Sequence, residues 1–152
     1  LEAGRGRRDL QRLAHRLGWC VANAESLPFD DHSADFVTIA FGLRNVTDRQ
    51  AALHEAYRIL KPGGRFLCLE FSHVQSRPLA KLYDSFSFNI LPVMGQVIAG
   101  DADSYRYLAE SIHTFPSKEM LADMFAEAGF AQIRVRSLSA GIACIHSGWK
   151  LD

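Results

Sequence analysis

Apolar and polar positions along the chain follow helical spacing in some stretches and strand-like runs in others. Leucine and alanine recur at helical spacing over residues 8–17, and Gly18 follows where a helix commonly ends. The apolar residues 19–24 then predict a short strand, and the proline and aspartates of 25–33 predict a loop. Residues 34–41 are almost uniformly apolar, which is typical of a strand covered on both faces in a parallel sheet.

The region after this strand predicts a βαβ unit. Thr47-Asp48-Arg49-Gln50 has the spacing of a capping box, in which the Thr and Gln side chains bind free amides at a helix start. Apolar positions then mark one helix face between residues 52 and 60, and Lys61-Pro62-Gly63-Gly64 ends that helix. Residues 65–71 form the next predicted strand. A strand, a helix and a strand in this order predict a right-handed crossover between parallel strands.

A long connection follows this unit. Residues 72–117 exceed the dozen or so that a simple crossover needs, so they predict an apolar helical insertion. Within it, apolar spacing predicts one helix near 79–90 and another near 105–112, with Asp103 as the N-cap of the second.

The C-terminal part predicts a helix followed by two strands. Ser117 is placed to cap a helix whose apolar positions run to Ala128, with Gly129 at its end. Residues 132–138 alternate in the manner of an edge strand with one wet face. The loop to the strand at 142–149 is so short that the two strands must be antiparallel neighbours. The whole pattern predicts one α/β domain with a mostly parallel sheet that ends in an antiparallel hairpin.

Composition and charge restrict the functional classes. Lysine plus arginine equals aspartate plus glutamate at 17 each, and this balance argues against general nucleic-acid binding. No apolar run approaches the ~20 residues of a membrane span, and the first residues show no signal-peptide pattern. Cys20, Cys68 and Cys144 lack metal-ligand spacing, so we expect no metal and interpret them as reduced core cysteines of a cytosolic-type protein.

Two candidate sites lie where strands of the predicted sheet end, because open α/β sheets bind ligands outside the carboxyl ends of their strands. At the first, Asn23 and the backbone N–H of Ala24 can pair with the edge of an adenine, although Asn23 can equally support its own turn. At the second, Gly42 lets the backbone pass close to a ligand, and Arg44 and Asn45 supply polar groups. The alternative at this second place is an arginine that pairs with a surface acid.

A third candidate site lies in the predicted insertion, where a few polar side chains stand among many apolar ones. These polar side chains are Tyr83, Asp84, Asp101, Asp103 and Tyr105. A largely apolar cover that carries a few acids suits an amphipathic ring substrate. In the alternative interpretation, Asp103 only caps a helix and the tyrosines belong to the core. The sequence contains no phosphate-binding glycine loop, nucleophile elbow or hydrolase-like set of His and carboxylate residues.

Several segments together resemble the ubiquinone/menaquinone biosynthesis C-methyltransferases, a family of class I S-adenosylmethionine-dependent methyltransferases. The Lys-Pro-Gly-Gly turn occurs in many methyltransferases, whereas the segments around Arg44 and Tyr105 are specific to this family. The resemblance covers nearly the whole chain. It implies a Rossmann-like fold and methylation of a ring carbon of a polyprenylated quinol. The segments that carry it are Asn23-Ala24-Glu25-Ser26-Leu27-Pro28-Phe29, Phe41-Gly42-Leu43-Arg44-Asn45-Val46-Thr47-Asp48, Tyr57-Arg58-Ile59-Leu60-Lys61-Pro62-Gly63-Gly64-Arg65, Leu69-Glu70-Phe71-Ser72, Asp103-Ser104-Tyr105-Arg106-Tyr107-Leu108-Ala109-Glu110-Ser111-Ile112 and His146-Ser147-Gly148-Trp149-Lys150.

The resemblance also implies roles for individual residues. Asn23 and Ala24 correspond to the adenine-side contacts of the cofactor, and Ala40 occupies a cofactor-facing position where only a backbone contact is left. Arg44 is expected to stabilise a phenolate, or to orient a water that takes the proton, because its guanidinium stays protonated. Asn45 is expected to position the ring. Further candidates for substrate contacts are Tyr83, Asp84 and Tyr105.

Members of this family begin with a strand, a glycine-rich loop and a second strand, all before the helix expected at 8–17. Residues 1–152 therefore correspond to the C-terminal portion of one methyltransferase domain, without the first two strands and the acid that holds the ribose hydroxyls. A polyprenyl substrate further implies a peripheral membrane surface, a quinone-synthesis complex, and the bacterial cytoplasm or mitochondrial matrix. Two alternatives stay open: a methyltransferase for another small molecule, and a non-catalytic truncated member or scaffold of such a complex.

The family's cofactor loop has no counterpart in these 152 residues. We therefore expect the chain alone to bind S-adenosylmethionine weakly or not at all. Isothermal titration calorimetry with S-adenosylmethionine measures this directly, and a micromolar Kd would contradict the expectation.

Overall fold

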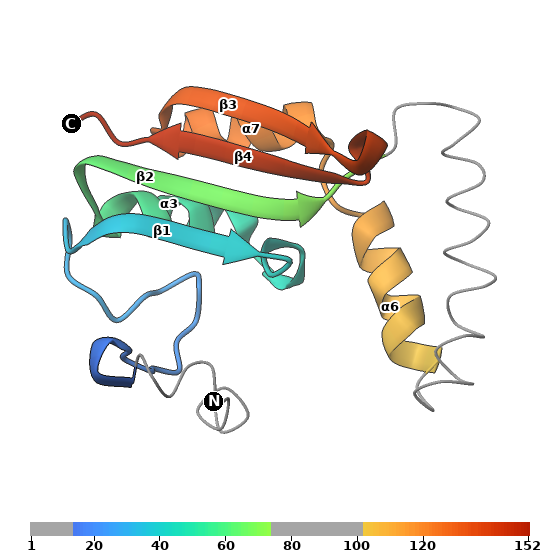
Figure 1. Ribbon diagram of the computed structural model, residues 1–152, viewed down its shortest axis with the longest axis horizontal. Coiled ribbons are helices and arrows are strands. Elements are labelled where there is room, and N and C mark those ends of the chain that lie inside the picture. Colours follow the sequence, from blue (N-terminus) through green and yellow to red (C-terminus); the bar gives the residue numbers. More distant parts are fainter. Residues whose placement is uncertain (1–13, 74–101) are drawn as a thin grey trace.

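A four-stranded sheet forms the centre of the molecule. The computed structural model describes residues 14–73 and 102–152, and within them the strands stand in the order β1-β2-β4-β3 (Figure 1). The strands are β1 (Ala34–Ala40), β2 (Leu60–Phe71), β3 (Ala131–Leu138) and β4 (Ala143–Trp149). The helices are α3 (Arg49–Ile59), α6 (Ala102–His113) and α7 (Lys118–Glu127), and the 3₁₀ turns are η1 (Ala14–Arg16), η2 (Leu43–Asn45) and η4 (Ser139–Gly141).

Three of these strands run in the same direction. β1 pairs with β2 in parallel, whereas β4 pairs antiparallel with both β2 and β3. β4 therefore lies between two strands of the opposite direction, and the arrowheads of β1, β2 and β3 all point toward α6 in Figure 1. The predicted α/β sheet, parallel in most of its strands and ending in a hairpin, is confirmed. β3 is an edge strand, as its alternating pattern predicts.

The hydrophobic core lies between the sheet and the helices α3 and α7, which cover the same face of it (Figure 1). Leu53 of α3 and Phe125 of α7 are fully buried. The Phe66 ring of β2 stacks on Phe125 and Phe130, with centroid distances of 5.2 and 5.4 Å. Gly148 permits this packing, because a Cβ atom at that position would lie 2.7 Å from the Cβ of Phe130. Removal of these apolar surfaces from water is what holds the helices to the sheet.

The prediction that β1 is covered on both faces is wrong within the described residues. Val37 and Ile39 pack against the core, but Phe36 is 66% exposed. Because α3 and α7 lie on one side of the sheet, alternate residues of β1, which are Phe36, Thr38 and Ala40, face away from both helices.

Residues 19–24 do not form the predicted strand. Their β-type pairing is limited to an isolated bridge between Asn23 and Ser26. A strand needs a neighbour for its backbone N–H and C=O groups, and this segment pairs with none of the described strands. Cys20 is consequently exposed instead of buried.

Other predictions are confirmed or fall partly outside the described residues. Cys68 and Cys144 are buried, as predicted. α6 is the second helix expected in the insertion, whereas the helix near 79–90 lies outside the described residues. Of the helix expected at 8–17, only the end is described, as the 3₁₀ turn η1. Within residues 14–73 and 102–152, every helix is too short or too polar to cross a membrane.

The start of α3 differs from the prediction by one residue. Asp48, not Thr47, is the N-cap, and its carboxylate accepts the N–H of Ala51 at 2.9 Å. An aspartate carboxylate is at least as good an N-cap acceptor as a threonine hydroxyl. Gln50 is not part of a capping box either, because its side-chain amide donates to the carbonyl of Met124 at 3.1 Å and ties α3 to α7.

The starts of the other two helices also test predictions. Ser117 caps α7 as expected, since its hydroxyl accepts the N–H of Met120 at 3.2 Å. Asp103 lies inside the first turn of α6 instead of before it, and its carboxylate pairs with Arg106 at 3.0 Å. An acid in the first turn still favours the helix through the helix dipole.

The end of α3 is held by a buried lysine. Lys61-Pro62-Gly63-Gly64 ends the helix as predicted, but it also forms the irregular start of β2. The Nζ of Lys150 donates to the carbonyls of Tyr57 at 3.0 Å and Arg58 at 3.4 Å. These carbonyls belong to the last turn of α3, where a cation is favourable. Burial lowers the pKa of Lys150.

His146 of β4 makes the stability of this core depend on pH. Its buried Nε2 lies 2.9 Å from the carbonyl oxygen of Lys118, to which it donates, and its Nδ1 has no partner among the described residues. Burial lowers the pKa of His146 below its ordinary value of 6.5, although the charge of Glu119 acts in the opposite direction. Below that pH the unfolded chain binds a proton that the folded chain does not bind. The free energy of unfolding should therefore fall as the pH drops below 6.5.

His146→Gln should reduce this pH dependence, because the amide cannot take up a proton. Chemical denaturation of both proteins at about pH 8 and about pH 5.5 measures the effect. At the higher pH, the difference in free energy of unfolding between the two proteins measures the loss of packing alone. If the free energy of unfolding of His146→Gln fell between the two pH values by as much as that of the unaltered protein, His146 would not be the source of the pH dependence.

Candidate functional site

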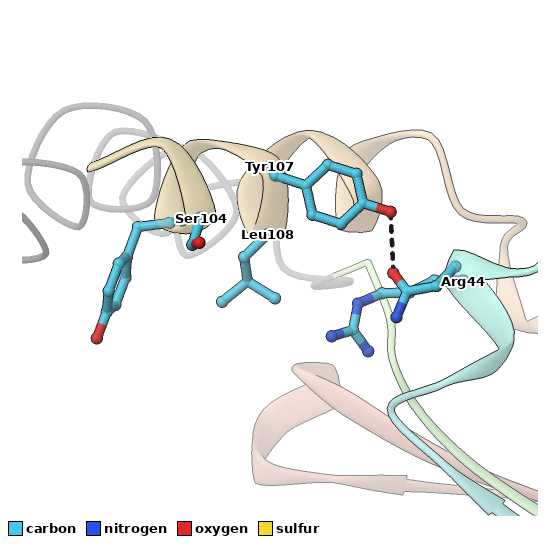
Figure 2. Close-up of a pocket in the computed structure, with 6 residues that line it drawn as sticks. Arg44, Ser104, Tyr107 and Leu108 are labelled. Carbon is cyan, nitrogen blue, oxygen red and sulfur yellow. Dashed lines mark hydrogen bonds between the residues drawn. The ribbon is translucent and has the colours of Figure 1, made fainter. Parts of the chain in front are cut away.

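A hollow lies between the carboxyl end of β1 and helix α6. Its volume is about 350 Å³, which is within the size range of small-molecule sites. η2 contributes one wall and α6 the other, and Figure 2 shows Arg44 facing Tyr107 and Leu108 across it. The residues that line it are Arg44, Asn45, Ser104, Tyr105, Tyr107 and Leu108.

A sharp turn at the end of β1 places Arg44 at this hollow. Phe41 has a positive φ of 52°, which is unfavourable for a side chain of this size, while its N–H is held by the carbonyl of Leu69 at 2.8 Å. Gly42 comes next, and a Cβ atom there would lie only 3.2 Å from the Ile39 side chain. The turn buries Leu43 in the core and leaves Arg44 at the rim of the sheet.

Arg44 is fixed on several sides. Its Nη1 donates to the carbonyl of Phe41 and to Oε2 of Glu70, at 3.1 Å from the latter. Its guanidinium lies 5.4 Å from the centroid of the Phe71 ring, which itself packs on Phe41 at 4.6 Å. The side chain is 11% exposed. The alternative of a surface acid as its partner is therefore wrong, because Glu70 is buried.

Asn45 and α6 are joined across the hollow. The hydroxyl of Tyr107 donates to Oδ1 of Asn45 at 3.1 Å, and Figure 2 marks this bond with a dashed line. With its oxygen engaged, Asn45 has its NH₂ group left as a donor. Tyr105 lines the hollow as expected, whereas Asp103 does not. Tyr83, Asp84 and Asp101 lie outside the described residues.

The predicted cofactor residues do not line this hollow. Oδ1 of Asn23 accepts the N–H of Glu25 at 3.1 Å, and its backbone carbonyl accepts the N–H of Ser26 at the same distance. Asn23 thus supports its own turn. Ala24 packs partly against the core, and Ala40 is exposed at the end of β1.

The loop that carries Asn23 and Ala24 is nevertheless tied to the same end of the sheet. Oε1 of Glu25 accepts the N–H of Asp48 at 2.9 Å, at the start of α3 and four residues beyond Arg44.

A second anchor for this loop lies further along α3. Glu55 accepts the N–H of Leu27 at 2.7 Å and pairs with Arg58, which also donates to the carbonyl of Phe29. The bonds from Arg58 lower the pKa of Glu55 to about 2, so this anchor stays charged over the physiological range.

The chemistry of the hollow follows from its residues. One fixed cation, one amide donor and two tyrosines can hold an oxygen-bearing aromatic ring, with Leu108 supplying an apolar contact. Within residues 14–73 and 102–152, no group of His, Cys, Asp or Glu side chains is arranged to hold a metal ion.

Two important residues are absent from the sequence-based set of site residues. Glu70 occurs in Leu69-Glu70-Phe71-Ser72, one of the segments that carry the family resemblance. A single acid in an apolar strand does not indicate which residue it pairs with. Tyr107 is one of two nearby tyrosines, and only the helical geometry of α6 shows that it reaches Asn45.

Known proteins resemble this chain closely in sequence. The sequence model described as the "ubiE/COQ5 methyltransferase family" matches residues 1–150. The "Ubiquinone/menaquinone biosynthesis C-methyltransferase UbiE" of Cereibacter sphaeroides is 53% identical over 151 residues, which are 99% of this chain and 60% of that protein. The human "2-methoxy-6-polyprenyl-1,4-benzoquinol methylase, mitochondrial" is also 53% identical over 99% of this chain, which spans 46% of it.

Solved structures share the fold. A possible histamine N-methyltransferase of Thermotoga maritima, described as S-adenosylmethionine-dependent, has a TM-score of 0.62 at 25% identity over 94% of this chain and 70% of its own. An O-methyltransferase family protein of Burkholderia thailandensis has a TM-score of 0.65 at 19% identity over 98% of this chain and 40% of its own. The fold is that of the class I methyltransferases. Since the family model and the relatives both match nearly the entire sequence, this chain belongs to the ubiE/COQ5 methyltransferase family.

Proposed function

We propose that this chain forms the acceptor side and part of the cofactor side of an S-adenosylmethionine-dependent C-methyltransferase that methylates a polyprenylated quinol ring in ubiquinone or menaquinone biosynthesis. The names of the bacterial and mitochondrial relatives support this substrate class. The observation that carries the proposal is the hollow that Arg44 and Asn45 of η2 line together with Tyr105 and Tyr107 of α6. The chain spans 60% of the bacterial relative, so the activity of the whole protein is inferred from that relative.

The hollow suits a quinol in shape and polarity. A quinol ring carries hydroxyl groups that accept from Arg44 and from the NH₂ group of Asn45, while its faces contact tyrosine and leucine side chains. The engagement of Asn45 by Tyr107 fixes the direction in which the amide donates. A ring bound in this way would present a carbon atom at the rim of the sheet.

The cofactor residues fit an adenine in part. The N–H of Ala24 makes no hydrogen bond to a described residue, so it can donate to a ring nitrogen. Asn23 retains its NH₂ group and one lone pair beyond its turn bond. Ala40 offers backbone alone at the carboxyl end of β1. In this proposal Asn23, Ala24 and Ala40 would hold S-adenosylmethionine, which would supply an electrophilic methyl carbon and whose sulfur would keep the electron pair of the broken bond.

Arg44 acts on the acceptor ring. A neutral quinol carbon is a weak nucleophile, whereas loss of a hydroxyl proton places negative charge on the ortho carbon. The fixed guanidinium of Arg44 stabilises the phenolate oxygen or orients a water that takes the proton, and it stays protonated throughout. The ring carbon that gains the methyl group loses its own proton to water.

The apolar tail determines the setting of the reaction. A polyprenyl chain partitions into lipid, so we place the protein at a membrane surface and in a quinone-synthesis complex, in the bacterial cytoplasm or the mitochondrial matrix.

Arg44→Ala should lower kcat by about 100-fold, as removal of one oxyanion donor commonly does, while KM for S-adenosylmethionine changes by less than about threefold. The measurement uses a chimera in which this chain replaces its matching segment in the Cereibacter sphaeroides protein, with a polyprenyl quinol as acceptor. Arg106→Ala is the matched control, because Arg106 is an exposed arginine of α6 that pairs with Asp103 and does not line the hollow.

The control should keep the turnover of the unaltered chimera. Unchanged kcat in Arg44→Ala would remove Arg44 from the mechanism, and a chimera that methylates other phenols but no quinol would overturn the substrate class.

A further inference from the structure

We propose that Glu70 is the positioning residue of this site, acting by holding Arg44 at both its backbone and its guanidinium. The inference rests on the proposed function, in which Arg44 stabilises the phenolate. Glu70 is the penultimate residue of β2, so the strand itself fixes where its carboxylate stands.

Glu70 is a buried charge. Its side chain is 1% exposed, on the face of β2 that also carries the core residues Phe66 and Cys68. An ionised carboxylate in such a place is strongly unfavourable unless it is paired with a cation and fully hydrogen-bonded. Among the described residues, the cation that contacts it is Arg44.

The two carboxylate oxygens of Glu70 bind different parts of Arg44. Oε1 accepts the backbone N–H of Arg44 at 3.2 Å. Oε2 accepts Nη1 of Arg44 at 3.1 Å and the backbone N–H of Phe71 at 3.2 Å. One carboxylate therefore fixes both ends of the same arginine, and its own orientation is set by the strand through Phe71.

The contacts of Arg44 with Glu70, Phe41 and Phe71 determine which of its hydrogen-bond donors is left for a ligand. Nη1 is used by Glu70 and by the carbonyl of Phe41, and the ring of Phe71 restricts the plane of the guanidinium. Within the described residues, neither Nη2 nor Nε has a hydrogen-bond partner, but Nε is buried, so Nη2 is the donor that a ligand can reach. A flexible arginine would lose side-chain entropy on meeting an anion, whereas this one is already ordered.

A salt bridge that only supports the fold would also bury Glu70. The two roles differ in one respect: a positioning residue acts on turnover only through Arg44. Its loss must therefore have no effect once Arg44 is absent, because residues that act as a unit are not additive.

The test compares variants in the chimera described above. Glu70→Gln keeps the shape and removes the charge, and Glu70→Asp keeps the charge on a shorter side chain. We expect Glu70→Gln to lower kcat at least tenfold with little change in KM for S-adenosylmethionine, and Glu70→Asp to recover part of the loss. The double variant Arg44→Ala/Glu70→Gln should turn over no more slowly than Arg44→Ala alone.

Leu121→Ala is the control for stability. Leu121 is buried on α7 and does not line the hollow, so its truncation should lower the free energy of unfolding while kcat is retained. Retained kcat in Glu70→Gln, or an additive loss in the double variant, would overturn the inference.

A second measurement needs no catalysis. In the 152-residue chain, Glu70→Met removes both acceptor oxygens at similar length, and hydrogen exchange at the backbone N–H of Arg44 should accelerate at least tenfold relative to the amides of β2. If the exchange rate of the Arg44 N–H relative to the amides of β2 were unchanged, Glu70 would not be what holds the backbone of Arg44. A chimera without quinol methylation would instead refute the proposed function, and full turnover in Arg44→Ala would remove both Arg44 and Glu70 from the mechanism.

Discussion

The parallel pairing of β1 with β2 is the constraint on which the site depends. It aligns the carboxyl ends of both strands, so that Ala40 lies opposite Leu69 and the next residue, Phe41, donates its N–H to the Leu69 carbonyl. From that shared edge β1 turns into η2 and supplies Arg44, while Glu70 is the penultimate residue of β2. An acid and an arginine 26 residues apart in sequence meet because the register between the strands puts them there.

The geometry at this edge is maintained by the core beneath it. Phe41 has an unfavourable positive φ, and Glu70 is a charge in an apolar setting. Neither feature would persist in a loosely packed protein. Leu43, buried directly after the turn, and the stacked rings of Phe66 and Phe125 hold the strand ends in place. The strained backbone and the buried carboxylate thus lie next to Arg44 and Asn45, which line the hollow.

Much of the fold could be predicted from local sequence. Helical spacing and end signals gave α7 with its cap at Ser117, and alternation gave β3 as an edge strand. The failures concern interactions that no local pattern contains. An apolar run at 19–24 carries strand propensity, but a strand also needs a neighbour, and none of the described strands supplies one. The uniform apolarity of residues 34–41 does not tell which faces will be covered.

The site shows the same limit. Glycine and polar residues after an apolar strand indicated Arg44 and Asn45, because the ends of parallel strands are where such groups can converge. Their partners could not be deduced. Glu70 has the pattern of a core position, and Tyr107 belongs to a helix that approaches η2 only in three dimensions. In this chain the sequence therefore indicates two groups that line the hollow, but not the residues that hold them in place.

The arrangement of faces would also separate the two reactants of the proposed methyl transfer. The side chain of Ala40 lies on the face of the sheet that α3 and α7 leave uncovered, whereas Glu70 belongs to the face that they cover. Arg44 lines the hollow toward α6, beyond the ends of both strands. A donor held near Ala40 and an acceptor held by Arg44 and Asn45 would approach the same sheet edge from different directions. Such an approach suits an in-line displacement, because the methyl carbon must pass between two groups on opposite sides of it.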